Sequence, residues 1–224
     1  MSGTLFVVST PIGNLGDITL RALEILKNVD IIACENMERH LKLLNHYGIK
    51  KRMITYSPAN EKNSSKGIIK LLLEGRNIAL VSDAGVPGLS DPGAVLLEEA
   101  GKNFIKTLPV PGVSALTTLL SISGMSFKKT IFIGYLPKAI SRIEKEFYRH
   151  KDFNGAIVFF ANQRHVKNVL FLINKIFGNV DVIIGREMTK INEEYIRDKV
   201  GCILERGFEE RGEFTILIHN RLKK

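Results

Sequence analysis

The residues best suited to bind a ligand or take part in catalysis are concentrated in one loop. It spans positions 82–93 and reads Ser-Asp-Ala-Gly-Val-Pro-Gly-Leu-Ser-Asp-Pro-Gly, directly after the most apolar stretch of the chain. Its glycines would let the backbone approach a ligand closely, and Asp83 offers a carboxylate for hydroxyl groups or a cation. Asp91 before Pro92 is typical of a helix N-cap followed by proline at the first helical position. We interpret the loop as part of a ligand site, with a long structural turn as the alternative.

Two further loops of proline, glycine and small polar residues follow apolar runs in the same way, at 10–17 and 109–115. The chain contains no Gly-x-x-x-x-Gly-Lys-Ser/Thr sequence, which excludes a phosphate loop. No Gly-x-Gly-x-x-Gly follows an apolar run either, so the common dinucleotide fingerprint is absent. We therefore expect a cleft lined by three loops, whose ligand needs no phosphate cradle.

Alternation of apolar runs with amphipathic segments in the first half predicts a parallel sheet with helices on both faces. Sheets of this kind bind ligands beyond the carboxyl ends of their strands, which is where the three loops lie. Asp17 is a candidate cap for the first helix. The expected strands cover 5–8, 30–34, 53–56, 77–81 and 104–108, and the later helices cover about 37–45, 61–73 and 92–100.

The second half has a different pattern, with expected strands at 131–133, 156–160, 180–184, 194–196 and 213–218 and helices at about 141–150 and 164–176. The last strands leave no room for long helices between them, so antiparallel pairing is expected. A boundary near Pro111 and Gly112 then divides the chain into two α/β domains. The N-terminal domain, 1–111, would carry a parallel sheet and the loops, and the C-terminal domain, 112–224, a mixed sheet.

The 224 residues have an ordinary globular composition, 45% hydrophobic, with a formal net charge of +9. This basic balance favours polyanionic partners such as RNA or DNA, although it also fits an unspecialised protein. Cys34 and Cys202 do not suggest a disulfide framework, and the five histidines lack the i, i+4 spacing of a metal site. With no basic signal-peptide start and no apolar run of spanning length, we expect a cytoplasmic protein without membrane attachment.

The order of several motifs resembles the tetrapyrrole methylase superfamily, and most closely its ribosomal RNA branch. The most specific match is Thr-Pro-Ile-Gly-Asn-Leu-Gly-Asp-Ile-Thr-Leu-Arg-Ala-Leu at 10–23. Further matches lie at 43–49, 82–87, 90–93, 111–115, 186–190, 193–194 and 211–214. The likeness therefore covers nearly the whole chain.

The resemblance implies a homodimer of two-domain subunits that binds S-adenosylmethionine in a cleft between the domains. It also implies the acceptor, a cytidine ribose 2′-hydroxyl in small-subunit ribosomal RNA, either free or in the assembled subunit. By the same analogy the cofactor contacts come from loops of the first domain and from the second domain: Pro11, Asp83, Ala84, Gly85, Ser114, Ala115, Phe160, Met188 and Thr215.

A ribose hydroxyl is a poor nucleophile, so a positioned general base would accelerate the transfer by roughly 10²–10⁴-fold. Glu35, at the end of the strand expected over 30–34, is the first candidate. Lys190, close to Glu187, is the second if burial lowers its pKa. Each could equally be a partner in a structural ion pair.

Two segments depart from the pattern of the branch. Positions 35–38 read Glu-Asn-Met-Glu instead of Glu-Asp-Thr-Arg, and 159–165 read Phe-Phe-Ala-Asn-Gln-Arg-His instead of Phe-Tyr-Glu-Ser-Pro-His-Arg. The changes bear on the acceptor side and motivate one alternative, a non-catalytic cofactor-binding factor in ribosome assembly. The other alternative stays within the superfamily and is C-methylation of a tetrapyrrole, although the loop at 10–17 favours the RNA branch. Basic residues over 128–129, 138–151 and 164–167 suggest a phosphate-contacting surface, with a solvated helix face as the alternative.

Overall fold

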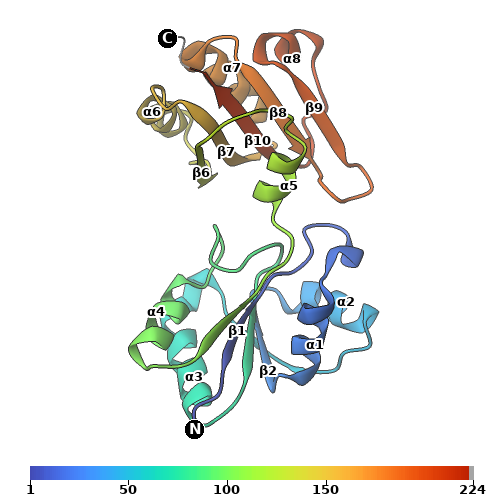
Figure 1. Cartoon of the computed structure of the whole chain (residues 1–224), viewed down its shortest axis with the longest axis vertical. Coiled ribbons are helices and arrows are strands. Elements are labelled where there is room, and N and C mark those ends of the chain that lie inside the picture. The colour runs from blue at the N-terminus through green and yellow to red at the C-terminus, as the bar shows by residue number, and fades with distance from the viewer. Residues whose placement is uncertain (222–224) are drawn as a thin grey trace. The chain divides into compact units, whose positions relative to one another are not determined.

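The computed structural model describes residues 1–221, which form two compact units that divide between Ser114 and Ala115. The sequence had suggested a boundary near Pro111 and Gly112. Each unit contains a five-stranded sheet with helices (Figure 1). The first sheet is parallel and the second is mixed, which confirms the predicted fold class.

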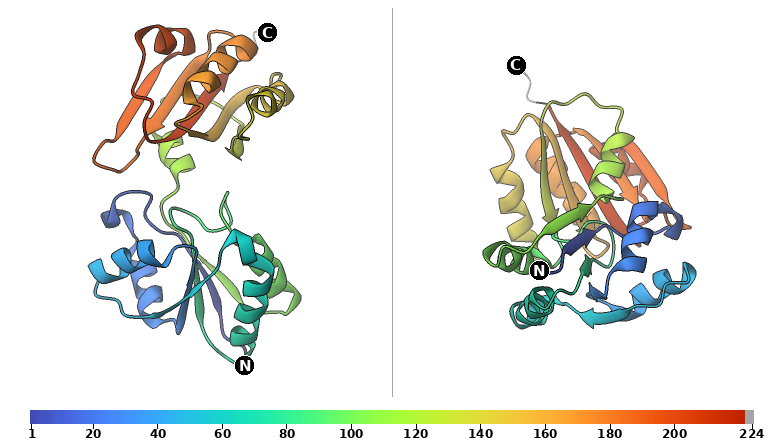
Figure 2. Two further views of the ribbon diagram at one scale, coloured as in Figure 1. Left: turned by 180° about the vertical axis from the view of Figure 1, so that it is seen from behind. Right: turned by 60° about the horizontal axis from the view of Figure 1, so that its bottom comes forward.

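The N-terminal unit has its strands in the order β3-β2-β4-β1-β5, all parallel. Figures 1 and 2 show its helices α1 and α2 on one face of the sheet and α3 and α4 on the other. Its elements are β1 (Leu5–Val8), η1 (Leu15–Asp17), α1 (Leu20–Asn28), β2 (Ile31–Cys34), α2 (Met37–His46), β3 (Arg52–Thr55), η2 (Pro58–Asn60), α3 (Glu61–Leu73), β4 (Ile78–Val81), α4 (Ala94–Lys102) and β5 (Thr107–Val110).

Strand side chains in this unit alternate between two apolar cores. Ile31 and Ala33 of β2 are buried with the residues of α3 and α4, whereas Ile32 and Cys34 are buried with those of α1 and α2. Burial on both faces explains why the strands read as unbroken apolar runs. Because the strands are parallel, their carboxyl ends all lie at one edge, and this edge carries the loops at 9–17, 82–93 and 111–114.

Two helix starts in this unit differ from expectation. Helix α1 is capped by the Thr19 hydroxyl, which accepts from the backbone amide of Ala22 at 3.1 Å, and Asp17 lies in η1 instead. Helix α4 begins after Gly93, without a side-chain cap from its own N-cap residue. Glu61 of α3 takes that role, because its Oε1 accepts from the Gly93 amide at 2.9 Å. The expectation that Asp91 is an N-cap was therefore wrong.

The C-terminal unit has its strands in the order β6-β7-β10-β8-β9. The first pair is parallel, and the other three pairs are antiparallel. Its elements are α5 (Ala115–Ser121), β6 (Thr130–Tyr135), α6 (Ile140–Arg149), β7 (Gly155–Asn162), α7 (Val166–Phe177), β8 (Asp181–Arg186), β9 (Glu194–Lys199), α8 (Val200–Arg206) and β10 (Glu213–Asn220).

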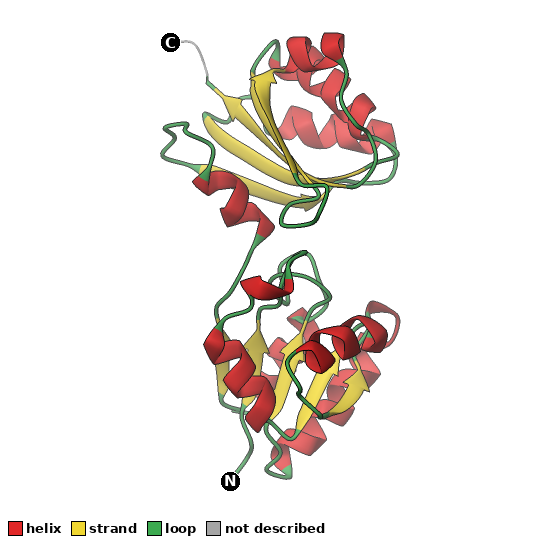
Figure 3. Ribbon diagram, turned by 90° about the vertical axis from the view of Figure 1, so that its right-hand side faces the viewer, coloured by secondary structure: helices red, strands yellow, loops and turns green. Residues whose placement is uncertain are grey.

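One face of this mixed sheet is covered by α6, α7 and α8, and α5 lies against the other face (Figure 3). The main core lies under the three helices and includes Phe159, Ile184 and Ile216. Helices α5 and α8 were not predicted, because each is only seven residues long. Within residues 1–221, no helix combines the length and the apolar character needed to cross a membrane.

Candidate functional site

The loops after β1 and β4 are joined directly at the carboxyl edge of the N-terminal sheet. Thr10 and Gly85 exchange two backbone hydrogen bonds, with N–O distances of 2.9 and 3.0 Å. The Thr10 hydroxyl also donates to the Ser82 carbonyl at 2.9 Å, and the Ser82 hydroxyl donates to the Gly85 carbonyl at 3.2 Å. Gly85 has a φ of 79°, a left-handed value that favours glycine. This ladder fixes Pro11 beside the segment that carries Asp83, Ala84 and Gly85.

The loop after β5 closes on the same edge. A Cβ on Gly112 would lie 2.8 Å from Cβ of Ser9, so only glycine permits this approach of the two loops. A Cβ on Gly85 would lie 3.4 Å from Cγ2 of Ile12 and 3.8 Å from the Val113 carbonyl oxygen. Three loops that are far apart in sequence therefore meet, and Ser114 stands at the end of the third.

Three carboxyl groups lie at this edge, on Glu35, Asp83 and Asp91. Burial and the charge of Asp83 raise the pKa of Glu35, while Arg39 opposes that shift. Burial, followed by the charge of Glu35, raises the pKa of Asp91 to about 6, although a hydrogen bond with Ser82 acts in the opposite direction. The mutual repulsion of these groups shows that they form one electrostatic cluster. Carboxyl groups with raised pKa values are suited to accept a proton near neutral pH.

Asp83 links the end of β4 to the start of α2. Its Oδ1 accepts from the Asn36 amide at 3.1 Å, and its Oδ2 lies 3.6 Å from Nη1 of Arg39. His40 is buried beneath it, with Nδ1 2.9 Å from the Asn36 carbonyl oxygen and Nε2 3.2 Å from that of Ser82. The Asp83 side chain keeps 22% of its surface exposed, so it remains open to a ligand.

Positions 36–38, which depart from the pattern of the branch, form the start of α2 beside Asp83. The Asn36 side chain caps α2 by accepting from the Arg39 amide at 3.2 Å. Glu38 is exposed on α2, whereas Arg39, one residue later, faces Asp83. Arg39 is therefore the cation that lies beside Asp83 at this edge.

The residues predicted in the C-terminal unit form a group on the α5 face of its sheet. Thr215 of β10 is directly opposite Phe160 of β7 on one side and Gly185 of β8 on the other, so all three point to the same face. A Cβ on Gly185 would lie 2.5 Å from Sδ of Met188 and 3.0 Å from Leu119 of α5. Met188 therefore packs over Gly185, beside Thr215, and Ala115 opens the helix that carries Leu119.

Lys190 belongs to an ion-pair network in the same unit. Its Nζ donates to Glu187 at 3.1 Å and to Glu213 at 2.8 Å. Burial acts to lower the pKa of Lys190, but the hydrogen bonds to Glu213 and Glu187 outweigh it, and the pKa is raised. A role for Lys190 as a base required a lowered pKa. Because the pKa is raised instead, Lys190 stays protonated near neutral pH.

The segment at 159–165, the second place where the sequence departs from the branch, also has structural roles. Oε1 of Gln163 accepts from the Gly212 amide at 3.0 Å, which ties the segment after β7 to the start of β10. Oδ1 of Asn162 accepts from the Arg164 amide at 2.9 Å. These two amides hold the segment between β7 and α7 in place.

Sequence reasoning did not find Asp91, Arg39 or His40 as parts of the site. Asp91 was interpreted as a helix cap and not as a site residue, because the Asp-Pro pattern also occurs at helix starts. Arg39 and His40 lie one turn into a helix, and only the pairing of β2 with β4 brings that turn to Asp83. Among residues 1–221, no group of three or more His, Cys, Asp or Glu is arranged to hold a metal ion.

Comparison with known proteins identifies the family of this chain. Residues 4–203 match the family model described as Tetrapyrrole (Corrin/Porphyrin) Methylases. The chain belongs to the tetrapyrrole methylase family. A family relative from Thermotoga maritima, named Ribosomal RNA small subunit methyltransferase I, is 42% identical over 98% of this chain and 99% of its own length. A relative of the same name from Leptospira biflexa is 37% identical over 99% of this chain and 92% of its own. The chain is thus a methyltransferase and requires a methyl donor.

Solved structures of low sequence identity share the tetrapyrrole methylase fold. Diphthine synthase superposes with a TM-score of 0.74 at 15% identity, over 99% of this chain and 92% of the other. Uroporphyrin-III-C-methyltransferase from Thermus thermophilus superposes with a TM-score of 0.69 at 14% identity, over 97% and 94%. At these identities the likeness concerns the fold alone.

Proposed function

We propose that this protein transfers a methyl group from S-adenosylmethionine to the ribose 2′-hydroxyl of a cytidine in small-subunit ribosomal RNA. The observation that carries the proposal is the cluster of Glu35, Asp83 and Asp91 at the loop edge, in a chain whose relatives are ribosomal RNA small subunit methyltransferases. The net charge of +9 supports an RNA substrate.

The chemistry of the loop edge fits this donor. S-adenosylmethionine carries a sulfonium and an ammonium charge as well as ribose hydroxyls, and Asp83 offers a partly exposed carboxylate for such groups. Gly85 lets the backbone approach a ligand without a side chain in the way. We assign Pro11, Asp83, Ala84, Gly85 and Ser114 as donor contacts. When bound, the donor supplies an electrophilic methyl group.

Glu35 is the proposed general base. Its pKa is raised by burial and by Asp83, which makes it a better proton acceptor near neutral pH than an ordinary glutamate. In this role Glu35 would take the proton of the acceptor hydroxyl as its oxygen bonds to the methyl carbon. The sulfur–carbon bond of the donor would break in the same step, and S-adenosylhomocysteine would leave. Asp91 is the competing candidate, because its pKa of about 6 also suits the task.

In the C-terminal unit, we propose that Ala115, Phe160, Met188 and Thr215 contact the donor, with the ring of Phe160 against its adenine. Supporting this, Phe160 and Thr215 lie side by side in the sheet, and Met188 packs next to them. We assign Lys190 as a fixed cation, held by Glu187 and Glu213, in place of the base role considered from the sequence. The resemblance also supports a homodimer.

Three acceptors tested in parallel decide between the proposal and its alternatives. Small ribosomal subunits from a strain lacking this protein, free small-subunit RNA and a tetrapyrrole precursor would each be incubated with enzyme and radiolabelled S-adenosylmethionine. Label in the subunits or the RNA supports the proposal, whereas label only in the tetrapyrrole favours C-methylation. Donor binding by calorimetry without any transfer would instead indicate a non-catalytic assembly factor.

A further inference from the structure

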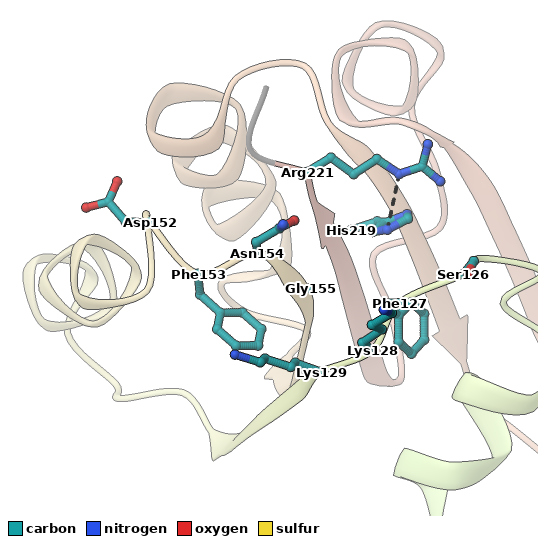
Figure 4. A pocket seen from close by; sticks show the side chains of 10 residues that line it. All are labelled: Ser126, Phe127, Lys128, Lys129, Asp152, Phe153, Asn154, Gly155, His219 and Arg221. Atoms are coloured by element: carbon teal, nitrogen blue, oxygen red, sulfur yellow. Dashed lines mark hydrogen bonds between the residues drawn. The ribbon is translucent and has the colours of Figure 1, made fainter. Parts of the chain in front are cut away.

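The C-terminal unit contains a cavity that is not part of the proposed methyl-transfer site. It has a volume of about 700 Å³ and lies where the segment before β6, the loop before β7 and the end of β10 meet. Figure 4 shows that Phe127 and His219 line it from the first and last of these segments and Phe153 from the loop. Lys128, Lys129 and Arg221 complete its basic rim.

The cavity and the proposed site lie at opposite ends of β10. Thr215 and His219 point to the same face of the sheet, because they are four residues apart on one strand. Because each residue of a β-strand advances the chain by about 3.3 Å, Thr215 and His219 lie about 13 Å apart along β10. A ligand in the cavity would therefore contact the protein well away from Thr215 and Phe160.

His219 lines the cavity and is largely buried. The side chain is only 4% exposed, and its Nε2 lies 3.2 Å from Nε of Arg221. Arginine can only donate, so Nε2 accepts and the ring proton is on Nδ1. Burial, followed by the charge of Arg221, lowers the pKa of His219, so the ring is neutral. Nδ1 is buried and has no hydrogen-bond partner within residues 1–221.

The charged groups around the cavity are mostly cations. Lys128 and Lys129 are exposed, and neither takes part in an ion pair within the described part of the chain. Asp152 is the acidic residue among those that line the cavity. Cations and hydrogen-bond donors without acceptors of their own are the groups that bind a phosphate.

The walls of the cavity are held in place by the sheet itself. The Asn220 side chain is buried and donates to the carbonyl oxygens of Lys151 and Phe153, both at 2.7 Å. A Cβ on Gly155 would lie 2.9 Å from the Phe153 ring, so glycine at this position allows the ring to pack against the start of β7. Phe127 packs edge-on against His219, with ring centroids 5.8 Å apart. The cavity is thus a built feature of the unit.

We propose that this cavity binds a backbone phosphate of single-stranded RNA together with the unpaired nucleoside attached to it. Lys128, Lys129 and Arg221 would contact the phosphate, and Phe127 and Phe153 offer apolar ring faces for the base. A volume of about 700 Å³ is in the range of sites that enclose a small organic molecule. Stacking on aromatic rings beside a basic rim is the general mode of single-strand binding. The inference rests on the proposed RNA substrate and adds a second contact that positions it.

The test is RNA binding by the full chain, measured separately from methyl transfer. A fluorescent 12-nucleotide oligocytidylate and small-subunit ribosomal RNA would be titrated at several salt concentrations, with anisotropy as the readout. The variant is Lys128→Gln/Lys129→Gln. The control is Lys62→Gln/Lys66→Gln, which removes the same charge from exposed positions of α3 in the other unit.

We expect the Lys128→Gln/Lys129→Gln protein to bind both RNAs about tenfold more weakly than the control does. The slope of log affinity against log salt should fall by about 1, as expected for one or two lost phosphate contacts. His219→Gln, with its folding checked by thermal unfolding, should weaken binding without changing that slope. Equal affinities and slopes for the lysine variant and its control would overturn the proposal.

A competition experiment separates RNA from a free phosphate compound. Cytidine monophosphate and inorganic phosphate at millimolar concentration should displace little of the RNA. Full displacement by either would overturn RNA as the ligand and indicate a small-molecule site. Because binding is read without the methyl donor, a failure of methyl transfer with the binding difference intact would refute the proposed reaction and leave the cavity assignment standing.

Discussion

Nη1 of Arg39 lies 3.6 Å from Oδ2 of Asp83, which places a cation at the edge of a cluster of carboxyl groups. The same arginine opposes the rise in the pKa of Glu35 that burial and Asp83 produce. The rise in the pKa of the proposed base is therefore partly offset by a residue on α2 that the motif pattern does not include.

Replacing Arg39 should change the pH dependence of the reaction. In Arg39→Gln the pKa of Glu35 rises further, so Glu35 stays protonated to a higher pH. The acidic limb of the kcat/KM profile should therefore move to higher pH, because this limb reports the essential base of the free enzyme. Arg76→Gln is the control, since Arg76 also lies 3.6 Å from an aspartate, Asp30. An unchanged acidic limb in Arg39→Gln would argue against Glu35 as the base.

Asp91 should make folding less favourable at neutral pH. Its folded-state pKa of about 6 is above the ordinary 3.8, so its contribution to stability is present below pH 3.8 and is lost as the pH rises through 6. Compared with wild type, Asp91→Asn should have a higher free energy of unfolding at pH 8. We expect this gain to be roughly 1–3 kcal/mol larger at pH 8 than at pH 4. Denaturant unfolding at both pH values measures this, with the exposed Glu38→Gln as the control. A gain of the same size at both pH values would contradict the pKa assignment.

Tyr56 should stabilise the start of α4. It is 1% exposed, and its hydroxyl donates to Glu61 at 2.7 Å and accepts from the Leu96 amide at 3.2 Å. Tyr56→Phe leaves that amide without a partner, so the free energy of unfolding should fall by about 1–3 kcal/mol. Tyr195→Phe also removes a hydroxyl that donates to a glutamate, but at a residue that is 40% exposed. An equal fall in the free energy of unfolding in the two variants would show that the buried hydrogen bonds of Tyr56 do not contribute to stability.

Gly185 should be required for the arrangement of Met188 and Thr215. In Gly185→Ala the new Cβ would lie 2.5 Å from Sδ of Met188, so that side chain has to move. Overpacking of this kind costs about 1–3 kcal/mol in stability, and calorimetry should show weaker binding of S-adenosylmethionine. Gly101→Ala in α4 is the control, because a Cβ there meets nothing within 4 Å. Donor affinity at the wild-type level in Gly185→Ala would remove Met188 from the donor site.

The sequence predicted the fold class and the strands better than it predicted the roles of individual side chains. Unbroken apolar runs such as 78–81 identified the strands of the parallel sheet, and the loops at their carboxyl ends were correctly placed at one edge. The errors lie where a local pattern has two meanings or where the partner is distant in sequence. Asp91 reads as a helix cap, although the side chain that caps α4 is that of Glu61, which lies 32 positions before the Gly93 amide that it accepts from. The raised pKa of Lys190 depends on Glu213, 23 positions away, and no local pattern indicates that contact.

The most direct test of the central claim is where the methyl group is found in the RNA. Small ribosomal subunits from a strain lacking this protein would be labelled with enzyme and radioactive S-adenosylmethionine, and the RNA would then be hydrolysed with alkali. A methyl group on a ribose 2′-oxygen blocks cleavage of the next phosphodiester bond. We predict label in alkali-resistant dinucleotides that begin with cytidine, with a large loss of label for Glu35→Gln. Label released entirely as mononucleotides would place the methyl group on a base and contradict transfer to the ribose hydroxyl.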